Sequence, residues 1–83
     1  MSASQPALPD LAGRRLGMGL SLGEIAEATK IGVRYLDAIE RGQFGKLPGG
    51  IYSISYIRQY ARALEIDASR LLELYFGTVM GDC

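Results

Sequence analysis

The chain has 83 residues, of which 48% are apolar, and this is enough for one small domain with a modest core. It contains no histidine and a single cysteine at the last position, which excludes an internal disulfide and a zinc site built from histidine and cysteine. Nine basic and nine acidic residues give a net charge of zero, which weakens a nucleic-acid function without excluding it, because only the charge on the docking face counts.

The sequence predicts a soluble chain without a membrane span. No apolar run approaches the ~20 residues that cross a bilayer. The first ten residues lack the basic start and apolar stretch of a secretion signal. We therefore expect a cytoplasmic protein.

A weak first helix is predicted from about Pro9 to Leu16, because proline suits the first position of a helix. Gly13 in its interior costs about 1 kcal/mol relative to alanine. Leu11, Ala12 and Leu16 are expected to face inward.

The next helix is predicted to begin at Leu22, after a capping box. Ser21 and Glu24 have the spacing at which each side chain can bind the backbone N–H of the other residue. Two helical turns later the chain reaches a tight turn at residues 29–32. Lys30 stands there at a position that often holds glycine, and we expect it to take a left-handed backbone conformation.

A third helix is predicted from about Val33 to Arg41, and Gly42 ends it, because glycine enters the left-handed conformation without a steric cost. Two short helices around a tight turn form a helix-turn-helix pattern. One face of the third helix is apolar, and the opposite face carries charges at helical spacing. The apolar residues are Tyr35, Leu36 and Ile39, and the charged residues are Arg34, Asp37 and Arg41.

A loop and two further helices complete the chain. Residues 43–50 have the composition of a loop, in which Phe44 and Leu47 are expected to be buried. A fourth and longest helix is predicted over residues 51–64, with Ile57, Tyr60, Ala61 and Leu64 facing inward.

Asp67 can cap a last helix of about residues 68–76, which Gly77 ends. The predicted fold is therefore all-α, with five helices and no strand. It divides the chain into a disordered tail (1–8), a helix-turn-helix domain (9–77) and a C-terminal tail (78–83). The apolar residues of the last helix exceed one narrow stripe, and the excess either packs on the first helix or forms a homodimer face.

The order and spacing of several motifs resemble one family, the cytoplasmic helix-turn-helix domain of RodZ, the bacterial cell-shape protein. The motifs are Gly19–Leu22, Ala28–Ile31, Tyr35–Leu36 with Ala38–Glu40, Leu47–Gly49, and Arg58 with Tyr60–Arg62. The resemblance implies a five-helix, lambda-repressor-like fold. It also implies two kinds of work: RodZ domains dock onto the actin-like filament protein MreB, and relatives on the same fold bind DNA as transcription regulators.

The first functional hypothesis is that the third helix enters the major groove of duplex DNA. Arg34 can read guanine through its paired donors, and Val33 can touch a thymine methyl group. The candidate base-reading residues are Val33, Arg34, Asp37 and Ala38, and the candidate phosphate contacts are Lys30, Arg41 and Lys46.

The alternative for this face is an ordinary solvated helix surface. Arg34, Asp37 and Arg41 are spaced to form ion pairs within the helix. Asp37 and Glu40 would also repel phosphate.

The second functional hypothesis is that the fourth helix docks a protein partner, with MreB implied by the resemblance. The candidate interface residues are Tyr52, Ser55, Tyr56 and Gln59. Exposed tyrosines one helical turn apart suit a protein contact, because they offer rigid apolar area with a polar tip. The alternative is that both tyrosines are half-buried in the core.

Catalysis is the least expected class, because the chain has no histidine and no metal cluster, and no cofactor is predicted. Gly49 and Gly50 do not form a phosphate loop, since no Lys-Ser or Lys-Thr follows them. DNA binding is favoured if the 83 residues are a whole protein. Docking is favoured if they are a piece of a membrane-anchored chain, since RodZ proteins continue into a transmembrane helix.

Overall fold

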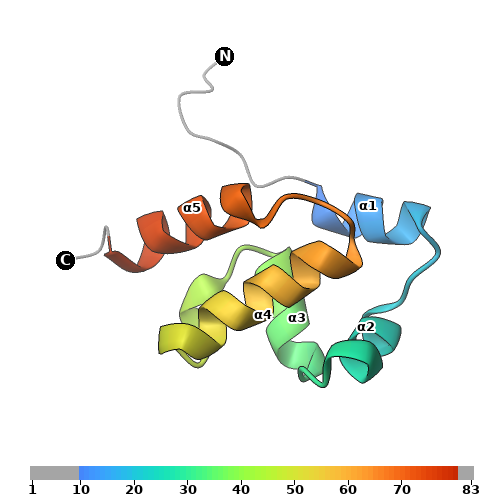
Figure 1. Ribbon diagram of the computed structural model, residues 1–83, viewed down its shortest axis with the longest axis horizontal. Helices are drawn as coiled ribbons and strands as arrows, with labels where there is room; N and C mark the ends of the chain where they lie inside the picture. The colour runs from blue at the N-terminus through green and yellow to red at the C-terminus, as the bar shows by residue number, and fades with distance from the viewer. Residues whose placement is uncertain (1–9, 81–83) are drawn as a thin grey trace, which may run out of the picture.

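The computed structural model describes residues 10–80, which form five α-helices, one short 3₁₀-helix and no strand (Figure 1). The elements in chain order are α1 (Leu11–Gly17), α2 (Leu22–Thr29), α3 (Val33–Glu40), η1 (Phe44–Lys46), α4 (Gly50–Ala63) and α5 (Ala68–Met80). The predicted all-α, five-helix class is confirmed.

Helix α4 is the centre of the fold and packs against α5, α2 and α3 (Figure 1). The predicted inward stripe is confirmed, since Ile57, Tyr60, Ala61 and Leu64 are all buried. Burial of each large apolar side chain contributes about 1.5–3 kcal/mol, and this stripe therefore carries much of the stability. Gly49 has φ +98°, and its N–H donates to the Ser53 hydroxyl (2.8 Å), which sets the start of the helix.

Helix α1 begins at Leu11, two residues later than predicted, because Asp10 is its cap. The Gly13 N–H donates to Asp10 Oδ1 (3.0 Å). A Cβ at Gly13 would collide with that carboxylate, and the glycine therefore makes room for the cap. Pro9, the predicted first residue, lies outside the described residues.

Leu16 was expected to face inward, and this is wrong, because its side chain is 65% exposed. Leu11 is the residue of α1 that is buried in the core. Leu16 lies five positions after Leu11, which rotates its side chain by about 140° around the helix axis from the direction of Leu11. This rotation turns Leu16 toward solvent.

The helix-turn-helix segment follows the prediction to within one residue at each helix end. In the capping box, the Ser21 N–H donates to Glu24 Oε1 (2.8 Å) and the Glu24 N–H donates to Ser21 Oγ (3.1 Å). Gly42 has φ +74°, which is the left-handed conformation expected after the third helix. Phe44 and Leu47 are buried as predicted and hold η1 against the core.

Helix α5 begins as predicted and ends later. The Ser69 N–H donates to Asp67 Oδ1 (3.0 Å), a backbone hydrogen bond that lowers the pKa of the Asp67 carboxyl. The predicted end at Gly77 is wrong, because the helix continues through residues 78–80. Gly77 keeps a helical backbone, and a glycine inside a helix costs only about 1 kcal/mol, which packing can offset. The rest of the predicted C-terminal tail and the tail at residues 1–8 lie outside the described residues.

Candidate functional site

The turn between α2 and α3 is stabilised by Thr29 and Lys30. The Thr29 hydroxyl donates to the Ile25 carbonyl (2.8 Å) and accepts from the Ile31 N–H (3.2 Å). Lys30 has φ +64° and ψ +26°, which confirms the predicted left-handed conformation. Ile31 is buried, and the turn therefore holds α3 firmly on the core.

The exposed face of α3 carries its charges in two different settings. The Arg34 guanidinium lies 4.9 Å from the centroid of the Tyr35 ring and donates to the Tyr35 hydroxyl (3.3 Å). Arg41 Nε donates to Asp37 Oδ1 (3.1 Å), which is the ion pair within the helix that the spacing predicts. Val33 is exposed beside them.

Two residues assigned to this face do not lie on it. Ala38 is 2% exposed and belongs to the core, so its side chain cannot reach a base edge. Glu40 was expected to repel phosphate, but its side chain is only 8% exposed and is paired with Arg15. Both turn inward because they share the side of α3 that carries Leu36 and Ile39.

Arg34, Tyr35 and Lys46 line a surface cleft of about 390 Å³ between α3 and η1. No ion pair joins Lys30, Arg34 or Lys46 to another residue in the described part of the chain. The start of α3 therefore presents three cations, whereas its end presents a neutralised pair.

The second candidate surface is the outward side of α4. Tyr52 is 64% exposed and Ser55 is exposed, while Gln59 is half-buried and its amide donates to the Ser55 hydroxyl (3.1 Å). Tyr56 is half-buried, and its ring packs against that of Tyr35 at a centroid distance of 5.5 Å. One tyrosine is therefore free for a partner, and the other mainly joins α3 to α4.

A partly buried polar cluster of Arg15, Glu40 and Tyr60 was not predicted from the sequence. Arg15 donates to both carboxylate oxygens of Glu40 (2.7 and 3.2 Å) and to the Leu20 carbonyl (3.0 Å). The Tyr60 hydroxyl donates to Glu40 Oε2 (2.9 Å). The cluster joins α1, α3 and α4 at one point.

The cluster shifts the pKa of two side chains, those of Arg15 and Tyr60. The hydrogen bond to Glu40 raises the pKa of the Arg15 guanidinium. Burial, together with the hydrogen bond to the carboxylate, raises the pKa of Tyr60. One signal in the sequence pointed here: Tyr60 lies in the inward stripe of its helix, and a buried tyrosine hydroxyl needs a polar partner.

Neither a metal nor a membrane span is indicated for the described part of the chain. No three acidic or cysteine side chains among residues 10–80 gather into a group that could hold a metal ion. None of the helices in this range is both long and apolar enough to cross a bilayer.

The order of helices, the tight turn and the exposed third helix define the class of helix-turn-helix domains. The family described as "Helix-turn-helix domain" matches residues 10–71. No solved structure matches the chain significantly.

Two curated relatives are similar to the chain. "Uncharacterized membrane protein YmfM" of Bacillus subtilis (strain 168) is 44% identical over 54 residues, which cover 65% of this chain and 19% of the relative. "Cytoskeleton protein RodZ" of Streptococcus pneumoniae (strain ATCC BAA-255 / R6) is 38% identical over 61 residues, which cover 74% of this chain and 22% of the relative. The chain thus spans about a fifth of the length of these relatives. It belongs to the family of RodZ-type helix-turn-helix domains.

Proposed function

We propose that this domain is a docking module that binds a cytoskeletal filament protein through the outward side of α4. The observation that carries the proposal is the exposed first turn of that helix, where Ile51 is 76% exposed and Tyr52 projects beside it. The name of the RodZ relative supports a cytoskeletal role, and the resemblance to RodZ domains suggests MreB as the partner, in the cytoplasm.

The physical reason is that moving the apolar surface of a tyrosine or isoleucine side chain out of water lowers the free energy of the complex. Burying such a side chain contributes about 1.5–3 kcal/mol, and tyrosine is enriched among the residues that dominate binding energy. Ser55 and Gln59 lie farther along the helix and offer hydrogen bonds at the edge of the same contact.

The test is binding of purified MreB to the wild-type domain and to Tyr52→Ala, measured by fluorescence anisotropy. We expect Tyr52→Ala to weaken binding about ten-fold or more while the domain stays folded, because Tyr52 has little packing to lose. Glu73→Ala, an exposed change on α5, is the matched control and is expected to bind like the wild type. Wild-type affinity in Tyr52→Ala would refute this use of α4.

A second candidate function is binding of duplex DNA by α3. It is favoured by the three cations around the start of that helix, Lys30, Arg34 and Lys46, and by exposed Val33. The Asp37–Arg41 pair argues against it, since that part of the helix offers no free charge.

The DNA test is anisotropy of labelled genomic duplex fragments at low and then physiological salt. If α3 contacts phosphates, binding should weaken steeply as the salt concentration rises. The slope of log affinity against log salt concentration should fall by about one for each contact that is lost. Arg34→Ala combined with Lys46→Ala is therefore expected to flatten the salt dependence. Binding that this double variant leaves unchanged would exclude α3 as the DNA-reading helix.

Two further expectations remain predictions. Leu72 and Leu74 are half-buried, and Phe76 and Val79 are exposed, so α5 keeps the apolar surface that suggested a homodimer. A monomer mass by light scattering at high concentration would exclude that dimer. The absence of catalysis and of a cofactor also stays a prediction.

A further inference from the structure

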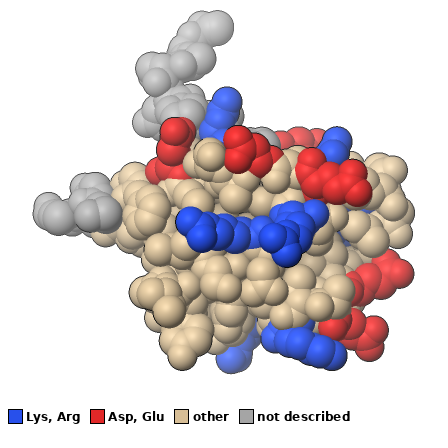
Figure 2. All heavy atoms as spheres, in the orientation of Figure 1, with Lys and Arg blue, Asp and Glu red and all other residues tan. Residues whose placement is uncertain are grey.

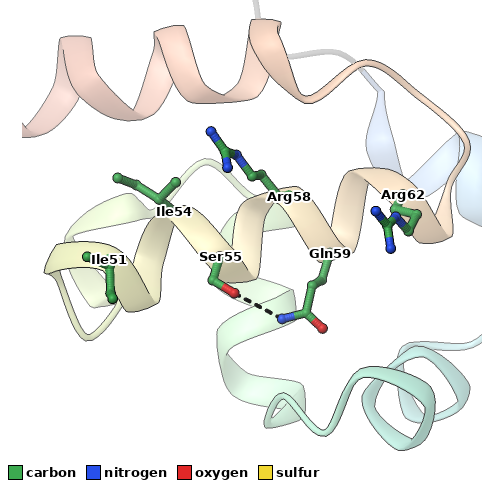
Figure 3. Close-up of a pocket in the computed structure, with 6 residues that line it drawn as sticks. All are labelled: Ile51, Ile54, Ser55, Arg58, Gln59 and Arg62. Atoms are coloured by element: carbon green, nitrogen blue, oxygen red, sulfur yellow. Dashed lines mark hydrogen bonds between the residues drawn. The ribbon is translucent and has the colours of Figure 1, made fainter.

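A groove of about 350 Å³ runs along the outward side of α4 (Figure 3). All the residues that line it come from this one helix: Ile51, Ile54, Ser55, Arg58, Gln59 and Arg62. They stand at positions 51, 54, 55, 58, 59 and 62, a helical spacing over twelve residues and a rise of about 16 Å. The groove is therefore long enough for two to three turns of a second helix.

The two ends of the groove differ in chemistry. Ile51 and Ile54 make the first end apolar, whereas Arg58 and Arg62 make the other end basic. Both arginines are exposed, and neither forms an ion pair with another residue of the described range 10–80. Arg15 and Arg41, by contrast, each bind a carboxylate.

The basic end opens toward α2. A second hollow of about 260 Å³ shares Gln59 and Arg62 with the groove and is otherwise lined by Ala28, Thr29 and Ala63. Alanine side chains leave room for another backbone to approach closely. A segment lying along α4 therefore finds space beside Arg62, next to Ala28 of α2.

We infer that this groove binds an acidic amphipathic segment of a partner protein. Apolar side chains of the segment contact Ile51 and Ile54, and its carboxylates pair with Arg58 and Arg62. Arginine suits this role because its planar guanidinium binds a carboxylate through two parallel hydrogen bonds. The inference rests on the proposed docking by α4 and adds the chemistry of the partner.

The charge distribution favours a narrow protein segment over a flat anionic surface. Figure 2 shows basic side chains in a band across the face on which α4 lies, with acidic side chains above the band and at the right-hand edge of the view. A lipid bilayer pressed on this face would bring its phosphates against those carboxylates. A single segment in the groove follows the basic band and avoids them.

The test measures binding of MreB to the wild type, Arg58→Glu and Arg62→Glu at about 50 and 150 mM salt, where screening of charge pairs differs. Each variant is expected to bind about ten-fold more weakly at low salt, because it places like charges together. The affinity of each variant is also expected to depend less on salt concentration than that of the wild type. Arg70→Glu on α5 makes the same change in net charge outside the groove and is expected to change affinity less than about two-fold.

The outcomes separate this inference from the proposed function. If Arg58→Glu and Arg62→Glu keep wild-type affinity while Tyr52→Ala loses it, docking by α4 stands and an acidic partner is refuted. If the wild type does not bind MreB, the named partner fails, and a synthetic helical peptide of leucine and glutamate becomes the probe. Salt-sensitive binding of that peptide, lost in Arg58→Glu, supports the inference. No binding to the peptide, or binding to phosphatidylglycerol vesicles alone, overturns it.

Discussion

Replacing Glu40 by alanine is expected to be among the most destabilising single changes in this domain. The Glu40 carboxylate is almost completely buried and accepts hydrogen bonds from Arg15 and from the Tyr60 hydroxyl. Removing it leaves a partly buried Arg15 guanidinium that keeps only its bond to the Leu20 carbonyl, and leaves the hydroxyl of the buried Tyr60 without an acceptor.

The expected loss is about 2–4 kcal/mol, somewhat below the ~3–5 kcal/mol for one partner of a fully buried ion pair, because the Arg15 side chain keeps contact with solvent. This range already includes the cost of leaving the Tyr60 hydroxyl without an acceptor. Domains have unfolding free energies of about 0.05–0.15 kcal/mol per residue, which gives about 4–12 kcal/mol for this chain. Glu40→Ala therefore removes a large share of the total stability.

Two companion variants test the reasoning. Tyr60→Phe keeps the Arg15–Glu40 pair and removes one hydrogen bond to a charged group, which predicts a loss of about 1.5–3 kcal/mol. Arg15→Met combined with Glu40→Leu is expected to lose less than Glu40→Ala, because removing both charges leaves no unpaired ion in the core.

The assay is urea unfolding followed by far-ultraviolet circular dichroism, with the free energy extrapolated to water. The expected order of stability is wild type, Tyr60→Phe, then Glu40→Ala. The reasoning fails if Glu40→Ala loses less than about 1 kcal/mol with an unchanged denaturant slope, since the pair would then contribute no more than a surface salt bridge.

Three further predictions concern the backbone and pH. Lys30→Gly is expected to raise the unfolding free energy by about 1 kcal/mol, because Lys30 holds a left-handed conformation that favours glycine, and urea unfolding measures the change. Gly77→Ala is expected to stabilise by a similar ~1 kcal/mol, because a Cβ there meets no atom and the backbone is helical; a loss of helix by circular dichroism would contradict this. Because folding raises the pKa of Tyr60, its contribution to the unfolding free energy is complete below the unfolded pKa near 10 and is lost as pH rises above that pKa. An absorbance titration of Tyr60→Phe should lack the tyrosinate step that the wild type shows at the highest pH.

Features that depend on neighbours in sequence were predictable. The capping box, the left-handed Lys30 and the left-handed Gly42 each depend on atoms within four residues, and all three are confirmed. The buried stripe of α4 follows from helical periodicity, which requires only that one side of the helix meets the core.

The candidate site was predicted less completely, because exposure depends on the other helices. Tyr52 and Tyr56 have the same residue type and lie one turn apart, yet only Tyr56 finds a ring from α3 to pack on. Arg58 and Arg62 were not selected from the sequence as binding residues, because nothing local distinguishes a free arginine from one that is paired.

The sequence by itself determined the class of protein, since helix starts, stops and the tight turn are encoded in local hydrogen bonding and glycine positions. The tertiary structure alone decided which charges are available. Arg15 and Glu40 are 25 residues apart and neutralise each other only because α1 and α3 meet, while Arg58 and Arg62 stay unpaired because no acidic side chain of the described residues lies within ion-pair distance. Pairing across helices is a property of the packed fold, and it leaves the groove of α4 and the start of α3 as open basic surfaces.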